Sequence, residues 1–219
     1  MALTFDPTAD FADVVDGLEA VTVNRRGSSN DTAVASALQR AINTHEINPT
    51  DGKVMAGDVR WHLPIEECET APRMGDAIVD ANSDRWTVLA VHEETLSARW
   101  KCICRNLRVA FGLDDTVAIE EASYAKGTAG AAEATWSTWK TGIAARVQPA
   151  LAEPATEQQQ RRTRRQYTIH LGEDVDLKKH HRIRWVGGTN CKSQLFFRII
   201  NYTRSEDVGQ LQLVVAEAW

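Results

Sequence analysis

The sequence lacks the features that mark membrane, secreted or disulfide-stabilised proteins. It has no apolar run of the roughly 20 residues that a membrane-spanning helix needs. Its first residues, Met-Ala-Leu-Thr-Phe-Asp-Pro, lack the basic-then-apolar order of a signal peptide. With 4 cysteines among 219 residues, the chain has too few thiols for a disulfide scaffold. We therefore expect a protein that is made in the cytoplasm and has no membrane partner.

Motifs of catalysis are also missing. There is no glycine-rich phosphate loop, no nucleophile elbow and no dinucleotide fingerprint. His92-Glu93-Glu94 lacks the second histidine that a metalloprotease helix needs. The carboxylate pair Glu66-Glu67 lies in an expected loop, and acid–base catalysis requires a fixed separation that loops do not supply. We expect no enzyme, no catalytic residue and no cofactor.

The candidate metal ligands do not form a known pattern. Cys102 and Cys104 alternate on an expected strand, so they share a face, and Cys68 is a third thiol. The CxxC spacing of zinc sites is absent, which favours buried free thiols over a metal site. His180-His181 precedes a basic strand, where neighbours would point to opposite faces. Together with Lys178 and Lys179 they indicate a solvated basic patch rather than shared ligands.

The last third of the chain has the pattern of short strands. Tyr167, Ile169 and Leu171 alternate with polar residues, as in a half-buried strand. The turn at 187–190 and the longer connection at 204–209 carry glycine at the expected places. The expected strands cover 142–147, 166–171, 182–186, 195–202 and 210–217. Five short strands with tight turns predict a small β-barrel.

This layout resembles the small head–tail joining proteins of tailed bacteriophages, of the head closure or stopper type. The resemblance covers roughly 136–219 and is carried by the segments Ala145-Arg-Val147, Tyr167-Thr-Ile-His-Leu171, Arg182-Ile-Arg-Trp-Val-Gly187, Phe197-Arg-Ile-Ile-Asn201 and Leu211-Gln-Leu-Val-Val-Ala-Glu217. It implies SH3-like barrels that assemble as a ring beneath the portal and extend or close the DNA channel.

The N-terminal part predicts two helices followed by four strands. Apolar residues at helical spacing favour helices over 7–21 and 32–43. The expected strands cover 54–63, 77–80, 86–93 and 98–105. The segments 54–63, 86–93 and 98–105 match 166–171, 195–202 and 210–217 in order and spacing. We therefore predict a tandem duplication of one barrel.

A Gly/Ala-rich segment separates the two expected copies. Its small residues, Lys126-Gly-Thr-Ala-Gly-Ala-Ala-Glu-Ala-Thr135, are typical of a linker. We predict a mainly β fold with a few short helices: an N-terminal barrel over 1–122, a linker over 123–135 and a C-terminal barrel over 136–219. Trp136 and Trp139 begin the second barrel, either as docking aromatics or as caps of the barrel end.

Charge is unevenly distributed along the chain. Residues 1–125 hold 11 Lys/Arg and 21 Asp/Glu, whereas residues 126–219 hold 14 and 9. The sharpest local cluster, within an excursion over 149–165, consists of Arg161, Arg162, Arg164 and Arg165. It could contact a neighbouring subunit or portal, lie in solvent, or contact DNA phosphates.

Together these features predict a structural virion protein of a tailed phage or prophage, located in the neck between head and tail. The partners that the resemblance implies are further copies in a sixfold or twelvefold ring, a portal or adaptor protein, a tail or tail-terminator protein, and packaged DNA. Two alternatives stay open: a nucleic-acid-binding β-barrel module that uses the basic second half, and a tail-terminator or other tail-completion protein.

Overall fold

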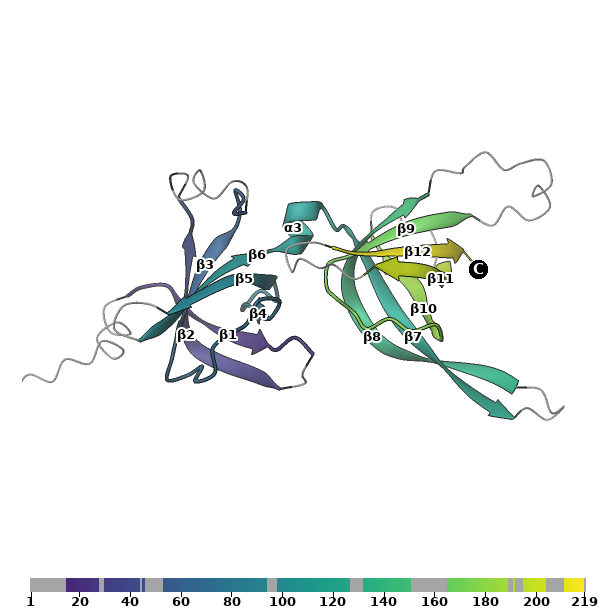
Figure 1. Ribbon diagram of the computed structural model, residues 1–219, viewed down its shortest axis with the longest axis horizontal. Helices are drawn as coiled ribbons and strands as arrows, with labels where there is room; N and C mark the ends of the chain where they lie inside the picture. The colour runs from purple at the N-terminus through teal and green to yellow at the C-terminus, as the bar shows by residue number, and fades with distance from the viewer. Residues whose placement is uncertain are drawn as a thin grey trace, which may run out of the picture. The chain divides into compact units, whose positions relative to one another are not determined.

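The chain forms two compact units, Met1–Ala110 and Phe111–Trp219. The computed structural model describes residues 15–27, 30–43, 45, 53–93, 98–126, 132–150, 165–188, 191, 195–203 and 211–218. Each unit is built on one closed antiparallel barrel (Figure 1). Among the described residues, no helix is both long and apolar enough to cross a membrane.

The first barrel has six strands: β1 (Leu18–Asn24), β2 (Asp31–Ala41), β3 (Val59–Pro64), β4 (Ala77–Val79), β5 (Arg85–Glu93) and β6 (Arg99–Arg105). Their order around the barrel is β1-β2-β3-β6-β5-β4, and β4 closes the barrel by pairing with β1. Alternate residues of each strand point inward. The interior is therefore filled by side chains such as Val23, Trp61, Leu63 and Ile78, all buried.

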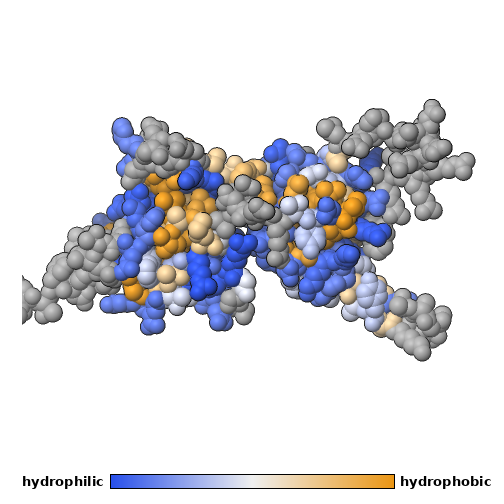
Figure 2. Space-filling model, viewed as in Figure 1, coloured by the Kyte–Doolittle hydropathy of each residue, from blue (hydrophilic) through white to orange (hydrophobic). Residues whose placement is uncertain are grey.

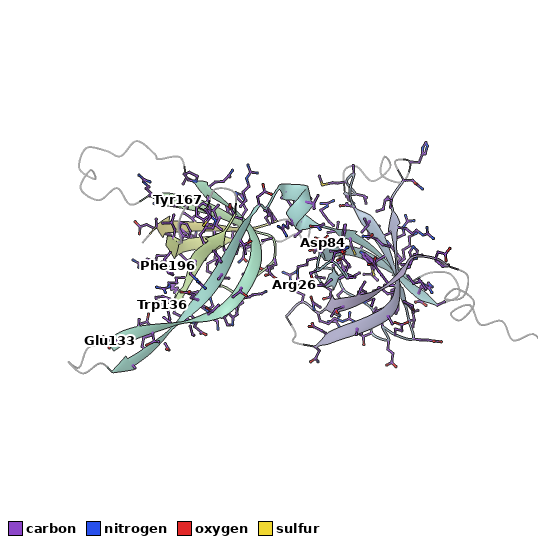
Figure 3. The ribbon with its side chains drawn as sticks, turned by 180° about the vertical axis from the view of Figure 1, so that it is seen from behind. Arg26, Asp84, Glu133, Trp136, Tyr167 and Phe196 are labelled. Atoms are coloured by element: carbon purple, nitrogen blue, oxygen red, sulfur yellow. The ribbon has the colours of Figure 1, made fainter. Side chains whose placement is uncertain are left out.

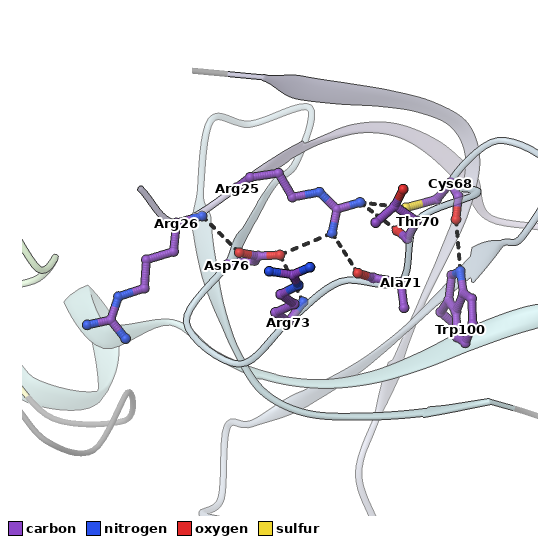
Figure 4. A network of polar contacts seen from close by, with 8 residues as sticks. All are labelled: Arg25, Arg26, Cys68, Thr70, Ala71, Arg73, Asp76 and Trp100. Atoms are coloured by element: carbon purple, nitrogen blue, oxygen red, sulfur yellow. Dashed lines mark hydrogen bonds and ion pairs between the residues drawn. The ribbon is translucent and has the colours of Figure 1, made fainter. Parts of the chain in front are cut away.

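Two buried ion pairs hold loops against this barrel. The Arg25 guanidinium donates to Asp76 at 3.1 Å and to the carbonyl oxygens of Thr70 and Ala71 at 2.6 and 2.9 Å (Figure 4). In the second pair, Arg105 donates from Nε and one terminal nitrogen to the two oxygens of Asp58, each at 2.8 Å. Because buried charges are tolerated only when paired and hydrogen-bonded, these contacts fix the loops in place.

The short helix α3 (Leu107–Phe111) leads into the second barrel, whose strands are β7 (Asp115–Lys126), β8 (Ala132–Pro149), β9 (Gln166–Leu171), β10 (His181–Gly187), β11 (Leu195–Thr203) and β12 (Gln212–Ala218). The order is β7-β8-β9-β12-β11-β10, closed by pairing of β10 with β7. Ile119, Ile143, Ile169, Ile183 and Phe197 are among its fully buried core residues.

The two barrels share one strand order, since β7 to β12 follow one another around the second barrel exactly as β1 to β6 do around the first. The predicted matches of 54–63 with 166–171, of 86–93 with 195–202 and of 98–105 with 210–217 therefore correspond to β3/β9, β5/β11 and β6/β12. The predicted repetition of layout is confirmed at the level of topology. A common origin of the two copies stays a prediction.

The predicted helix at 32–43 is wrong. These residues form β2, whose buried positions are Val34, Ala37 and Leu38. The pairing of β1 with β2 shifts register here. Glu19 and Val21 of β1 are two positions apart, whereas their partners Ala37 and Val34 in β2 are three positions apart. The extra residue of this bulge gives buried positions the spacing of a helix. Of the other predicted helix, 7–21, residues 7–14 lie outside the described part, and the strand β1 begins at Leu18.

The prediction of a linker at 123–135 is also wrong. The described residues of this segment, 123–126 and 132–135, belong to the strands β7 and β8. The boundary between units instead follows Ala110, so the second unit includes β7, a strand that the sequence pattern did not indicate. With the boundary after Ala110, the first unit carries 11 Lys/Arg and 17 Asp/Glu, and the second unit carries 14 Lys/Arg and 13 Asp/Glu. The net charges become −6 and +1, so the predicted basic character of the second unit largely disappears.

Candidate interaction surface of the second barrel

Strands β7 and β8 extend beyond the second barrel as a two-stranded arm, which we define as residues 123–126 and 132–135 (Figures 1 and 3). β7 pairs with β10 only as far as Glu121, opposite His181, but continues its pairing with β8 to Lys126. Among the described residues, the arm strands pair only with each other. The Tyr124 side chain is 65% exposed, and Glu133 lies on the same ribbon.

The arm therefore presents unpaired backbone edges on both of its strands. Closure of a barrel pairs most strand edges, whereas each strand of an isolated ribbon leaves one row of N–H and C=O groups open. Two-stranded ribbons without a core are only marginally stable in water. Such an arm is suited to binding another surface.

An arginine stacked between two aromatic rings lies where the arm joins the barrel. The Arg182 guanidinium carbon is 4.1 Å from the Trp136 ring centroid and 4.4 Å from that of Phe196. Alternation along β10 places Arg182 and Arg184 on the outer face, while His181, Ile183 and Trp185 are buried. Cations over aromatic faces are favourable, so the rings fix the guanidinium on this outer face.

Glu120 neutralises part of the positive charge of this surface. It lies opposite Arg182 in the pairing of β7 with β10 and is only 7% exposed. Arg182 donates to its Oε2 at 2.7 Å, and Arg184 lies 2.8 Å from its Oε1. One carboxylate thus holds two arginines, leaving a net positive charge between aromatic rings.

The histidine pair next to this stack is arranged differently from the prediction. The His180 and His181 rings lie edge to face with centroids 4.8 Å apart, not on opposite faces, because His180 belongs to a turn and strand alternation does not apply to it. His180 Nε2 is 3.0 Å from Glu121 Oε1. His181 is 3% exposed and packs against Trp139 at 4.7 Å between ring centroids. Burial, together with the neighbouring His180, lowers the pKa of His181.

The structure brings part of the predicted site together. Trp136 and Trp139 reach the same surface through their contacts with Arg182 and His181. The side chains of Lys178 and Lys179 are exposed in the turn just before His180. Arg165 is exposed next to β9, which pairs with the distant C-terminal end of β8. Three predicted residues lie outside the described residues: Arg161, Arg162 and Arg164.

Several residues of this surface were missed by sequence reasoning: Glu120, Glu121, Phe196 and Arg182. Glu120 and Glu121 were missed because β7 was not predicted, although Val117 and Ile119 alternate with smaller or polar residues as in a strand. Phe196 was assigned to a strand without a role. Its outward position follows from the burial of its neighbour Phe197.

A second apolar surface lies on the outer side of β11 and β12. Figure 2 shows hydrophobic residues of the second unit gathered around β12, with hydrophilic residues surrounding them. Leu213 and Val215 are half-buried outward-facing residues of β12, and Ile200 of β11 is 50% exposed. Exposed apolar residues that gather in this way are typical of contact surfaces.

The three thiols considered for a metal site lie in the core of the first barrel. Cys68, Cys102 and Cys104 are fully buried, and the predicted common face of the last two is confirmed. Burial raises the pKa of Cys102 to about 12 and also raises that of Cys68 and Cys104. All three pack within the apolar core of this barrel, which indicates a packing role.

Comparison of the chain with protein-family models, with curated proteins and with solved structures gives no match.

Proposed function

We propose that the protein is a structural virion component of a tailed phage or prophage, a head–tail connector of the stopper or completion class. The observation that supports this best is the arm, which leaves a closed barrel and offers open strand edges next to an aromatic and basic surface. Its function would be assembly rather than catalysis. The barrels would form the wall of a ring beneath the portal, and its loops would extend or close the DNA channel.

A ring of identical subunits needs two different complementary surfaces on each copy, because head-to-tail contacts must repeat around the axis. The arm supplies one of them, through addition of its open strand edge to a neighbour. The outer side of β11 and β12 is the second in this proposal. It offers hydrophobic area for Tyr124, and among the described residues β11 pairs beyond Arg198 only with β12, which leaves its other edge open to the arm. The ring would meet portal or adaptor protein on one rim and tail or tail-terminator protein on the other.

The SH3-like nature of the barrels belongs to the same proposal. It is supported by two small antiparallel barrels that repeat the same strand order along one chain. The polar excursion between β8 and β9, with its arginines, would reach a neighbouring subunit, the portal or DNA. Residues 151–164 of that excursion lie outside the described residues.

Size-exclusion chromatography with light scattering tests the proposal on the full chain. We expect a ring, or a monomer that assembles when portal protein is added. Replacing 124–134 with a two-residue Asn-Gly turn should abolish assembly while leaving the barrel folded, because the arm buries little. The control is Tyr124→Ser, which keeps the backbone edges and should weaken assembly less. A shortened chain that assembles like the wild type would refute the role of the arm.

A nucleic-acid-binding module is the second candidate, favoured by the stacking of Arg182 between Trp136 and Phe196. Aromatic rings next to cations are the usual means of holding single strands without sequence preference. This alternative predicts a stable monomer that binds single-stranded DNA, with an affinity that falls steeply with salt concentration. Because Glu120 compensates part of this positive charge, the connector proposal is preferred, and a monomer that binds DNA with a steep slope would replace it.

A further inference from the structure

Three side chains of metal-binding type meet at the base of the arm. Glu121 of β7 and the neighbours His180 and His181 each offer one ligand atom, and these atoms all lie within 4.8 Å of one another. Ligand atoms that share one tetrahedral Zn²⁺ lie about 3.3 Å apart, because Zn–N and Zn–O distances are about 2.0–2.2 Å. The 3.0 Å between His180 Nε2 and Glu121 Oε1 is already close to this value. Only His181 has to move appreciably.

The backbone that carries these ligands is held from both sides. Glu121 and His181 are direct partners in the pairing of β7 with β10. The N–H of Ala122 donates to the carbonyl oxygen of His180 at 3.2 Å, which joins the turn to β7 one residue further. The Trp139 ring lies against the His181 ring, with 4.7 Å between the centroids. The ligands thus come from two paired segments rather than from one flexible loop, as preorganised metal sites require.

We propose that Glu121, His180 and His181 form a site for a divalent transition-metal ion of the Zn²⁺ type. Two imidazoles and one carboxylate are a ligand set that suits Zn²⁺, with a fourth position for water. Calcium and magnesium are disfavoured, because both prefer oxygen ligands.

Binding requires exchange of two contacts. The hydrogen bond between His180 and Glu121 gives way to two bonds to the ion. The Lys178 N–H donates to His181 Nδ1 at 3.2 Å, at the long end of the normal range. That contact is lost whichever nitrogen of His181 binds the ion, because a neutral imidazole that uses one nitrogen as ligand keeps its proton on the other. Both exchanged contacts are single hydrogen bonds, and the ion compensates the charge of Glu121.

The position of the site gives it a structural role. Glu121 is the last residue of β7 that pairs with β10, and the arm begins two residues later. An ion held here would connect β7 to the turn before β10 at the point where the ribbon leaves the barrel. Metal binding would therefore fix the direction of the arm. The site itself depends only on these three side chains and not on the proposed connector function.

Titration of tag-free full-length protein with ZnCl₂ by isothermal calorimetry tests the site, after dialysis against a chelator. We expect one ion per chain, and Co²⁺ should give the visible absorption band of a tetrahedral site. Glu121→Gln and His180→Ala alter half-exposed side chains, so both variants should fold. Each should weaken binding by at least the roughly 10-fold to 100-fold loss seen when even outer partners of metal ligands are removed.

Two matched controls separate this site from other ligands of the same barrel. His170→Gln removes another histidine of the unit, and Cys191→Ser removes its partly exposed thiol. Both variants should bind Zn²⁺ like the wild type. Hydrogen exchange of the arm amides should slow on addition of Zn²⁺ in the wild type but not in Glu121→Gln. Wild-type protein that does not bind Zn²⁺, or binding that Glu121→Gln and His180→Ala leave unchanged, would overturn the proposal.

Discussion

Replacing Arg182 by lysine should destabilise the second barrel although the charge is kept. The guanidinium makes two cation–π contacts and a charged hydrogen bond to the largely buried Glu120. Cation–π contacts contribute about 0.5–2 kcal/mol each and charged hydrogen bonds about 1.5–3 kcal/mol. Lysine lacks the planar group that stacks between two rings. Because Arg184 still compensates Glu120 and the contributions are not additive, we expect a loss of about 2–4 kcal/mol.

Urea unfolding of the full chain, followed by tryptophan fluorescence, measures this loss. At a slope of about 2 kcal/mol per molar urea, typical of small proteins, the midpoint of the affected transition should fall by about 1–2 M. The control is Arg198→Lys, which changes an exposed arginine opposite Arg182 in the pairing of β10 with β11. Its effect should stay within about 0.5 kcal/mol. Equal midpoints for both variants would show that the stack contributes nothing specific.

Three further changes test other parts of the structure. Asp58→Ala should lower the free energy of unfolding by about 3–5 kcal/mol, because it leaves the buried Arg105 charge unpaired. The double variant Asp58→Ala/Arg105→Met should melt at a higher temperature than Asp58→Ala alone. A lower melting temperature of the double variant would refute the role of the ion pair. Gly188→Ala should strongly destabilise the second barrel, because the φ angle of residue 188 is +135° and an added Cβ would collide with Asp115. A melting temperature equal to that of the wild type would refute this prediction. Burial lowers the pKa of His170 below its ordinary value of 6.5, so the folded state favours the neutral ring. The stability that this shift contributes is complete above pH 6.5 and declines as the pH falls below it. In His170→Gln this decline of the free energy of unfolding should vanish.

The strands with clean alternation were predictable from sequence. Strand β9 occupies the predicted range 166–171, because Ile169 and Leu171 face the core while their neighbours do not. The bulge in β2 defeated the same reasoning, since it gave Val34, Ala37 and Leu38 a helical spacing. A bulge depends on the pairing partner, which the sequence of one strand does not reveal.

The arm was mistaken for a linker for a related reason. A ribbon that leaves the barrel has no core to bury, so selection for large apolar side chains is absent there. Glu133, Ala134 and Thr135 are all exposed, and their composition is that of a flexible segment. Backbone pairing holds them in β8 nonetheless, and such pairing leaves little trace in composition.

The candidate site was predictable only in part. Trp136 and Trp139 stand out by residue type, and the structure places both on the surface at the base of the arm. The partners of these rings are set by the register of β7 and β10, which brings Glu120 and Glu121 next to Arg182 and His181 from about 60 residues away in sequence. No local pattern specifies that register.

The repeated strand order carries a consequence for folding. Within each barrel the first strand must find the fourth, and the third must find the sixth, so closure waits for contacts that are distant in sequence and folding should be slow. Two copies of one order on one chain also allow a strand of one barrel to enter the other, a typical misfolding route of repeated domains. The cores oppose this exchange: β3 fills its barrel with Trp61 and Leu63, whereas the equivalent β9 has Leu171 and the much smaller Ile169. This difference between the two cores should protect the nascent chain against assembling the wrong barrel.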